Sequence, residues 1–153
     1  MPEIQETRRL PYSAEQMFDL VADVSRYAEF LPWVVATRVK SDSETEMVAD
    51  MLVGFKMLRE KFTSRVIKHR PSELHVHYID GPMRDLDNRW QFRPLGAAAC
   101  EIHFSVNFSF RNALFEKIAG QYVDRAFGKM VAAFEARAGE LYGSNNSSAI
   151  SVA

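Results

Sequence analysis

The segment CEIHFSVNFSF (100–110) alternates apolar and polar side chains along its whole length. A period of two places all the apolar side chains on one face of a β-strand and all the polar ones on the other. Such a strand belongs to an antiparallel sheet with one face in water and the other covered. The chain must therefore supply an element that covers the apolar face.

The period changes to 3.6 directly after this strand. Between Asn112, a candidate helix cap, and Gly143, a candidate stop, apolar residues recur at helical spacing. They predict one helix of roughly 30 residues, about 45 Å long at 1.5 Å per residue. An apolar stripe of this length needs an equally long apolar surface, which the sheet provides.

The first third of the chain predicts a strand and two short helices. Residues 3–10 form a candidate strand, and Ser13 with Gln16 makes a capping box for a helix that follows Pro11. A second short turn carries Tyr27 to Phe30, and Pro32 then forces the chain to leave extended.

The middle of the chain predicts further strands at 34–40, 45–53, 57–69, 74–78 and around Trp90, with Gly54-Phe55 as a turn or bulge. The helices cluster at the ends of the sequence and do not alternate with strands. This order indicates an α+β fold with an antiparallel sheet and a long C-terminal helix.

Length and composition narrow the class of protein. The chain has 153 residues and a net charge of −1, which favours one domain and argues against a DNA-binding protein. No apolar run is long enough to span a bilayer, and the single Cys100 suits a reducing compartment. We expect a cytoplasmic protein, at most peripheral to the inner face of the membrane, with residues 144–153 as a disordered tail.

Few residues suggest catalysis or metal binding. Cys100 falls on the apolar face of its strand, where a thiol is usually inert, and no nucleophile or phosphate-binding motif is present. His75 and His77 share a strand face, with His103 as a candidate neighbour, but no third ligand stands at a diagnostic spacing. We therefore expect surface histidines, no catalytic residue, no metal and no required cofactor.

Glu60 shares its predicted strand face with the apolar Leu58 and Phe62. A carboxylate on that face is costly without a partner, so it either orients a ligand in a cavity, enters a structural ion pair, or is turned outward by a bulge after Gly54. The two structural alternatives carry more weight. Whether the space under the long helix is a cavity or is filled by side chains stays open at this level.

The opposite strand faces carry several cations. Strand parity places Arg59, Lys61 and Arg65 outward, and Arg89 and Arg93 outward on a later strand. This predicts a locally basic outer face that could meet RNA phosphates or lipid headgroups. An ordinary solvated face is the more probable alternative.

Several segments together resemble the coenzyme Q-binding proteins of the START-like, polyketide cyclase/dehydrase superfamily. They are PYSAEQMFDLVADVSRYAEFLPWV (11–34), GFKMLREKFTSRV (54–66), DGPMRDLDNRW-F (80–92), FSVNFSFRN (104–112) and MVAAFEARAGELYG (130–143). The chain is also similar to the ribosome association toxin RatA group. The resemblance implies a helix-grip fold over residues 1–143, in which a sheet of about seven strands wraps the long helix and leaves a tunnel.

The two branches imply different functions. The first implies a non-enzymatic lipid chaperone that binds ubiquinone and supports respiratory electron transport and quinone biosynthesis, with transient contact to the membrane surface. The second implies an inhibitor that binds the large ribosomal subunit and blocks subunit association. Trp33 and the Gly54-Phe55 pair favour the quinone branch, whereas Val34 departs from a cysteine found there in some members.

Strand parity and the resemblance together give a set of candidate ligand contacts. Glu60 and Tyr78 are expected to orient the quinone head. The side chains expected to contact the tail are Phe30, Leu31, Trp33, Met51, Val53, Phe62, Trp90, Phe104, Phe108, Tyr122, Phe127 and Met130.

Overall fold

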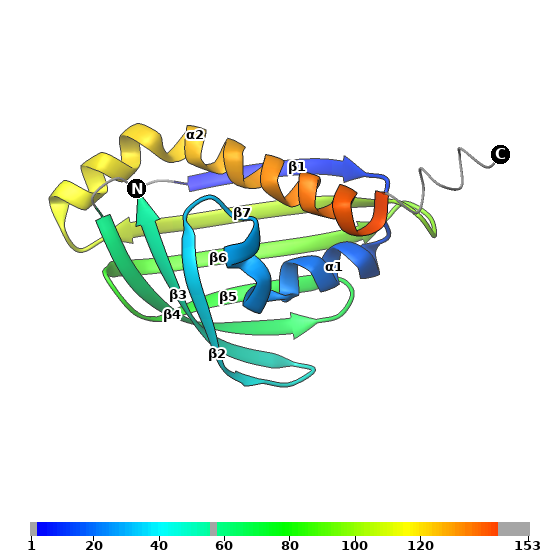
Figure 1. The fold of residues 1–153 in the computed structure, drawn as a ribbon, viewed down its shortest axis with the longest axis horizontal. Coiled ribbons are helices and arrows are strands. Elements are labelled where there is room, and N and C mark those ends of the chain that lie inside the picture. Colours follow the sequence, from blue (N-terminus) through cyan, green and yellow to red (C-terminus); the bar gives the residue numbers. More distant parts are fainter. Residues whose placement is uncertain (1–2, 56–57, 144–153) are drawn as a thin grey trace.

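The computed structural model describes residues 3–55 and 58–143. One antiparallel sheet of seven strands runs in the order β1-β7-β6-β5-β4-β3-β2 and curves beneath a long helix (Figure 1). The strands are β1 (Glu3–Leu10), β2 (Val34–Asp42), β3 (Glu46–Phe55), β4 (Leu58–His69), β5 (Glu73–Asp80), β6 (Met83–Pro94) and β7 (Cys100–Phe110). The expected α+β, helix-grip architecture is therefore confirmed.

The helices are α1 (Ala14–Ala22), the 3-10 helix η1 (Val24–Glu29), the long α2 (Ala113–Ala138) and its terminal π-helical turn η2 (Gly139–Gly143). The N–H of Gln16 donates to Ser13 Oγ at 3.1 Å, and the N–H of Ser13 donates to Gln16 Oε1 at 2.9 Å. This is the predicted capping box. The side chain of Asn112 accepts hydrogen bonds from the first N–H groups of α2, which confirms it as the helix cap.

The helices lie on one side of the sheet, which we call its inner face. In Figure 1, α2 crosses this side from end to end, and α1 lies close to the C-terminal half of α2. Helix α1 contacts α2, β5 and β6, while η1 contacts β2. In Figure 1, none of the shorter helices in the described part of the chain lies beside the N-terminal half of α2.

One local prediction was wrong. Gly54 and Phe55 form neither a turn nor a bulge, because they continue β3 in regular register with Arg59 and Leu58 of β4. Residues 56–57, between β3 and β4, and the predicted tail at 144–153 lie outside the described residues. Gly54 remains inside a strand because its N–H donates to the carbonyl of Trp33 at 2.9 Å, which gives the backbone a partner on the β2 side.

Candidate functional site

One half of the inner face is filled by side chains. We call it the closed half; its inward residues are all buried and are Met47, Ala49, Val66, Leu74, Trp90 and Phe92. Helix α2 reaches it through Phe134, whose ring centre lies 5.3 Å from those of both Phe30 and Trp90. A pocket of about 30 Å³ remains here, lined in part by Trp90 and Phe104. Its volume suits about one water molecule, so no lipid tail fits in it.

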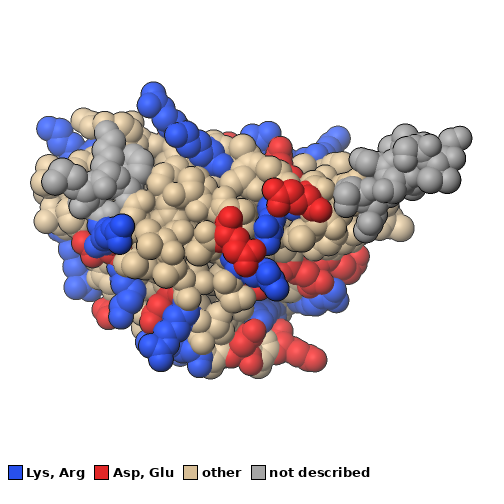
Figure 2. Space-filling view, viewed as in Figure 1, with Lys and Arg blue, Asp and Glu red and all other residues tan. Residues whose placement is uncertain are grey.

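The same strands behave differently farther along. Their next inward residues are only partly buried, and we call them the open half: Met51, Val53, Glu60, Phe62, Val76, Tyr78 and Leu86. Strand register places Met51 beside Phe62 and Val53 beside Glu60. Figure 2 shows an uncharged area in the middle of this side of the molecule, with Lys, Arg, Asp and Glu around its margin. The intermediate burial of its members means that the open half presents apolar side chains that the chain itself leaves partly accessible.

The cover over the two halves explains the difference. Helices α1 and η1 fill the space over the closed half together with the C-terminal half of α2. Nearer the N-terminus of α2, the described side chains that face the sheet are less deeply buried. Phe127 lies against Phe104 and Phe108, with ring centres 5.6 Å and 6.4 Å apart, but Phe127 and Met130 are themselves only partly buried.

Three polar side chains lie on the inner face of the sheet beside this apolar surface. Regular pairing of Glu60 with Val53 rules out the bulge that would have turned Glu60 outward. Within the described part of the chain, Glu60 has no salt bridge. Tyr78 accepts a hydrogen bond from the N–H of Met83 at 3.0 Å, so its hydroxyl can still donate.

Asn88 is a polar inner-face residue that sequence reasoning missed. Its Oδ1 accepts from Trp90 Nε1 at 3.0 Å, and its Nδ2 donates to the carbonyl of Ser105 at 2.9 Å. The alternation that placed Trp90 and Phe92 inward extends back to Asn88 and Leu86, and this signal could have found it.

The segment around Pro32 joins the two halves. Leu31 is buried, and Phe30 packs on Phe134 while the guanidinium of Arg137 lies 5.2 Å from its ring centre. Trp33 is partly exposed, and its carbonyl accepts from Gly54 near the open half. The first part of this segment therefore fills the closed half, and Trp33 lies next to the open half.

The candidate contact residues fall into three groups. Buried residues that fill the core are Leu31, Trp90, Phe104 and Phe108. Partly buried residues of the link and of α2 are Phe30, Trp33, Tyr122, Phe127 and Met130. Residues of the open half are Met51, Val53, Glu60, Phe62 and Tyr78.

The outer face carries both signs of charge, which differs from the predicted basic face. Arg65 Nε lies 2.6 Å from Glu46 Oε1, and Arg89 Nε lies 3.5 Å from Glu73 Oε1. The acidic partners come from neighbouring strands whose register was unknown from the sequence. Cys100 is fully buried on the inner face, and burial raises the pKa of its thiol to about 11, so little reactive thiolate forms near neutral pH.

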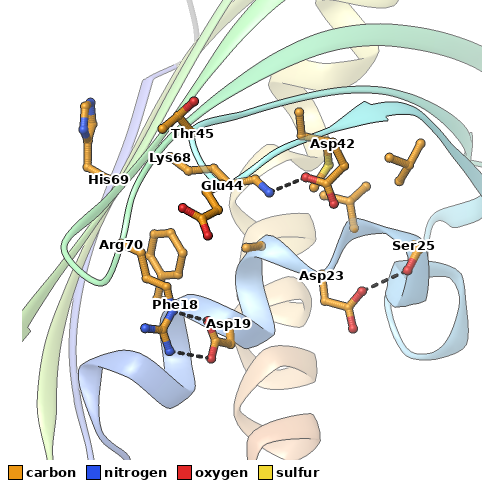
Figure 3. Close-up of a pocket in the computed structure, with 14 residues that line it drawn as sticks. Phe18, Asp19, Asp23, Ser25, Asp42, Glu44, Thr45, Lys68, His69 and Arg70 are labelled. Carbon is orange, nitrogen blue, oxygen red and sulfur yellow. Dashed lines mark hydrogen bonds and ion pairs between the residues drawn. The ribbon is translucent and has the colours of Figure 1, made fainter.

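A larger pocket of about 710 Å³ lies away from all the candidate residues. Figure 3 shows it between α1, η1, the β2–β3 turn and the end of β4. Arg70 binds Asp19 through two hydrogen bonds of 2.9 Å, and Lys68 pairs with Asp42. Two of the cations in this pocket are therefore already paired with carboxylates that line the same pocket.

A curved antiparallel sheet around one long C-terminal helix defines the helix-grip class of proteins. Within it, the chain belongs to the polyketide cyclase/dehydrase and lipid transport family, whose model matches residues 10–135. Among the described helices, none combines the length and apolar character needed to cross a bilayer.

Two relatives represent the two branches. The chain is 39% identical to the ribosome association toxin RatA of Pseudomonas aeruginosa, over 92% of this chain and 97% of the toxin. It is 33% identical to the mitochondrial coenzyme Q-binding protein COQ10 homolog B of Xenopus laevis, over 92% of this chain and 59% of that protein. Neither name denotes an enzyme.

Solved structures agree on the fold. The solution structure of the 18 kDa protein CC1736 from Caulobacter crescentus has a TM-score of 0.75 and 38% identity, covering 94% of this chain and 99% of that one. The Zhui aromatase/cyclase from Streptomyces sp. R1128 has a TM-score of 0.78, covering 90% of this chain and 93% of that one, but only 16% identity, so this likeness concerns the fold alone.

Proposed function

We propose that this protein binds a hydrophobic ligand of the polyprenyl quinone class, such as ubiquinone, on the open half of its inner face. The observation that carries the proposal is the partial exposure of inward-facing apolar residues on strands whose inward residues toward the other end are buried. The partly exposed residues are Met51, Val53, Phe62, Val76 and Leu86. Covering apolar surface stabilises a complex by about 2.5 kcal/mol for each 100 Å² removed from water. An isoprenoid tail is an occupant of matching chemistry.

The polar groups beside this surface suit the quinone head. The Tyr78 hydroxyl, which accepts from the N–H of Met83, can donate its own hydrogen to a quinone carbonyl. The second amide hydrogen of Asn88 is another donor on the same face of the sheet. The Glu60 carboxylate accepts hydrogen bonds only, so it fits a reduced quinol hydroxyl better than a quinone carbonyl. The remaining candidate contacts, in the link and on α2, would cover the tail.

The role proposed for the chain is that of a lipid chaperone, in which residues 1–143 form one ligand-binding domain. It would take the quinone up during a transient contact with a membrane surface and support respiration or quinone biosynthesis. Uptake and release need no covalent step, which is consistent with the inert thiol of Cys100.

Organic extraction of the purified protein, followed by mass spectrometry and by uptake of added ubiquinone, tests this proposal. Val53→Asp should abolish uptake because it charges the open half. Leu52→Asp is the matched control: its side chain is also partly buried but belongs to the opposite face of the same strand. Absence of quinone together with failed uptake, or equal loss in both folded variants, would contradict the proposal.

A second candidate function is binding to the large ribosomal subunit. It is favoured by the near full-length similarity to a ribosome association toxin. Exposed Arg59 and Lys61, on the outer face at the start of β4, are the cations proposed to meet rRNA phosphates.

Co-sedimentation with large subunits over a range of salt concentrations separates the two candidates. A ribosome-binding protein should lose affinity steeply with salt and with the double change Arg59→Gln and Lys61→Gln. Arg9→Gln is the control, because Arg9 already pairs with Glu101 at 3.0 Å. Sedimentation that the double change leaves unaltered would overturn this contact surface.

A further inference from the structure

Three side chains with metal-ligand chemistry meet on the outer face, across strands β5 and β6. His75 and His77 are two residues apart on β5, and Asp87 is the register partner of His77 on β6. The two imidazole rings are 4.0 Å apart between centres, and His75 Nε2 lies 2.7 Å from Asp87 Oδ1. One ligand atom from each residue falls within 4.8 Å of the others. The sequence showed no third ligand at a diagnostic spacing, and the pairing of β5 with β6 provides one.

We propose that His75, His77 and Asp87 form a surface site for a divalent transition metal of the zinc class. Two imidazole nitrogens and one carboxylate oxygen form a ligand set that Zn²⁺ takes in proteins, with water at the fourth position. Metal–ligand bonds of about 2.0–2.1 Å in a tetrahedral site separate ligand atoms by about 3.3 Å. His75 Nε2 and Asp87 Oδ1 lie 2.7 Å apart, and all three ligand atoms lie within 4.8 Å of one another. Small changes in side-chain torsions would bring these atoms to the spacing of a metal site.

The paired strands fix the backbone positions of all three ligands, which distinguishes this cluster from two exposed histidines on a mobile segment. All three ligands project from paired strands in the middle of the sheet, where β5 lies between β4 and β6. Their backbones are held by the ladder, so metal binding has to order side chains only. The bound metal would link β5 to β6 and raise the stability of the folded chain by mass action.

Arg89 opposes metal binding and provides a sharp test of the geometry. Its Nη2 lies 3.3 Å from His75 Nδ1, and its Nε lies 3.5 Å from Glu73 Oε1. Because Arg89 donates a hydrogen bond to His75 Nδ1, this nitrogen carries no proton. The ring proton of His75 is therefore on Nε2, where it faces Asp87. Coordination through Nε2 moves that proton to Nδ1, so Arg89 must withdraw toward Glu73. Arg89→Gln removes the positive charge and supplies an acceptor for Nδ1–H, which is a partner that metal-bound histidines favour.

Titration of the tag-free full chain with Zn²⁺, followed by calorimetry and thermal unfolding, tests the site. We expect one saturable Zn²⁺ per chain and a rise in Tm. His77→Gln should weaken binding at least about tenfold, because even loss of an outer-shell partner costs a metal site about tenfold or more. Arg89→Gln should tighten binding by about threefold or more, since it removes a nearby like charge. Titration with Co²⁺ should give the visible absorption of a four-coordinate cobalt site.

His103→Gln is the matched control. His103 lies on the same face of the sheet and beside a carboxylate, with Nε2 3.0 Å from Glu101 Oε2, but outside the cluster of His75, His77 and Asp87. The His103→Gln variant should bind Zn²⁺ with the same affinity as the parent chain. The proposal is overturned if the parent chain shows no saturable binding, or if folded His77→Gln and His103→Gln bind Zn²⁺ equally well. Circular dichroism checks the fold of each variant, and exposed His77 is replaceable without loss of packing.

Discussion

The closed and open halves of the inner face are built from the same strands and from similar apolar residues, yet only one is filled. Val66 and Phe62 lie four residues apart on β4 and both face inward, but Val66 is buried and Phe62 is partly exposed. The difference lies in the cover, because α1, η1 and Phe134 reach Val66's end of the sheet. An apolar face is thus a core where helices reach it and a candidate binding surface where they do not.

The largest effect is expected from Phe134→Ala in the closed half. Phe134 is 5% exposed and contacts the rings of Tyr27, Phe30 and Trp90. Truncating a buried phenylalanine leaves a cavity and should lower the free energy of unfolding by about 3–5 kcal/mol. Urea denaturation measures it, and a loss under about 1.5 kcal/mol would mean that the closed half is not tightly packed.

Phe62→Ala makes the corresponding change in the open half. Because Phe62 is only partly buried, the free energy of unfolding should fall by about 1.5 kcal/mol or less. Quinone uptake should weaken by about tenfold, since part of the ligand's apolar cover is lost. A large loss of stability with unchanged uptake would show that Phe62 belongs to the core, and the distinction between the halves would fail on this strand.

Thr63→Val tests how β3 and β4 are held together behind the open half. Thr63 Oγ1 donates to Asp50 Oδ1 at 2.6 Å, and this bond, with Lys40 nearby, lowers the pKa of the buried Asp50 carboxyl. The variant should lose about 1 kcal/mol of unfolding free energy at pH 7.

The effect of Thr63→Val should also depend on pH in a defined direction. A depressed pKa stabilises the folded state above the unfolded value of about 3.9, and this contribution is lost as pH falls through the folded pKa. Stability curves of the parent and the variant should therefore converge in acid. A constant difference from pH 7 down to pH 2 would contradict the role of the Asp50 charge.

The smallest effect is expected from Asp19→Asn, outside both halves. The Asp19–Arg70 pair joins α1 to the loop after β4, but both side chains are about half exposed. Exposed ion pairs contribute little in water. Thermal unfolding should show a slight decrease in Tm that vanishes at high salt, and a decrease that persists at high salt would assign this pair a structural role.

Much of the fold could be predicted from local patterns. The alternation at 100–110 and the helical period after Asn112 gave the last strand and the long helix, and Ser13 with Gln16 marked the start of α1. Gly54-Phe55 was misread because a glycine within a regular strand looks the same in sequence as a glycine at a turn. The candidate site could be predicted only in part: parity placed Glu60 and Phe62 inward, but burial depends on which helix lies above them.

The sequence by itself determined which face each side chain takes, because the periods of strands and helices are local properties of the backbone. Only the tertiary structure decided which inward residues are covered, and it also brought Asp87 beside His75 and His77. Cover and cross-strand neighbours depend on the register and order of the strands, and long-range hydrogen bonding and packing set both.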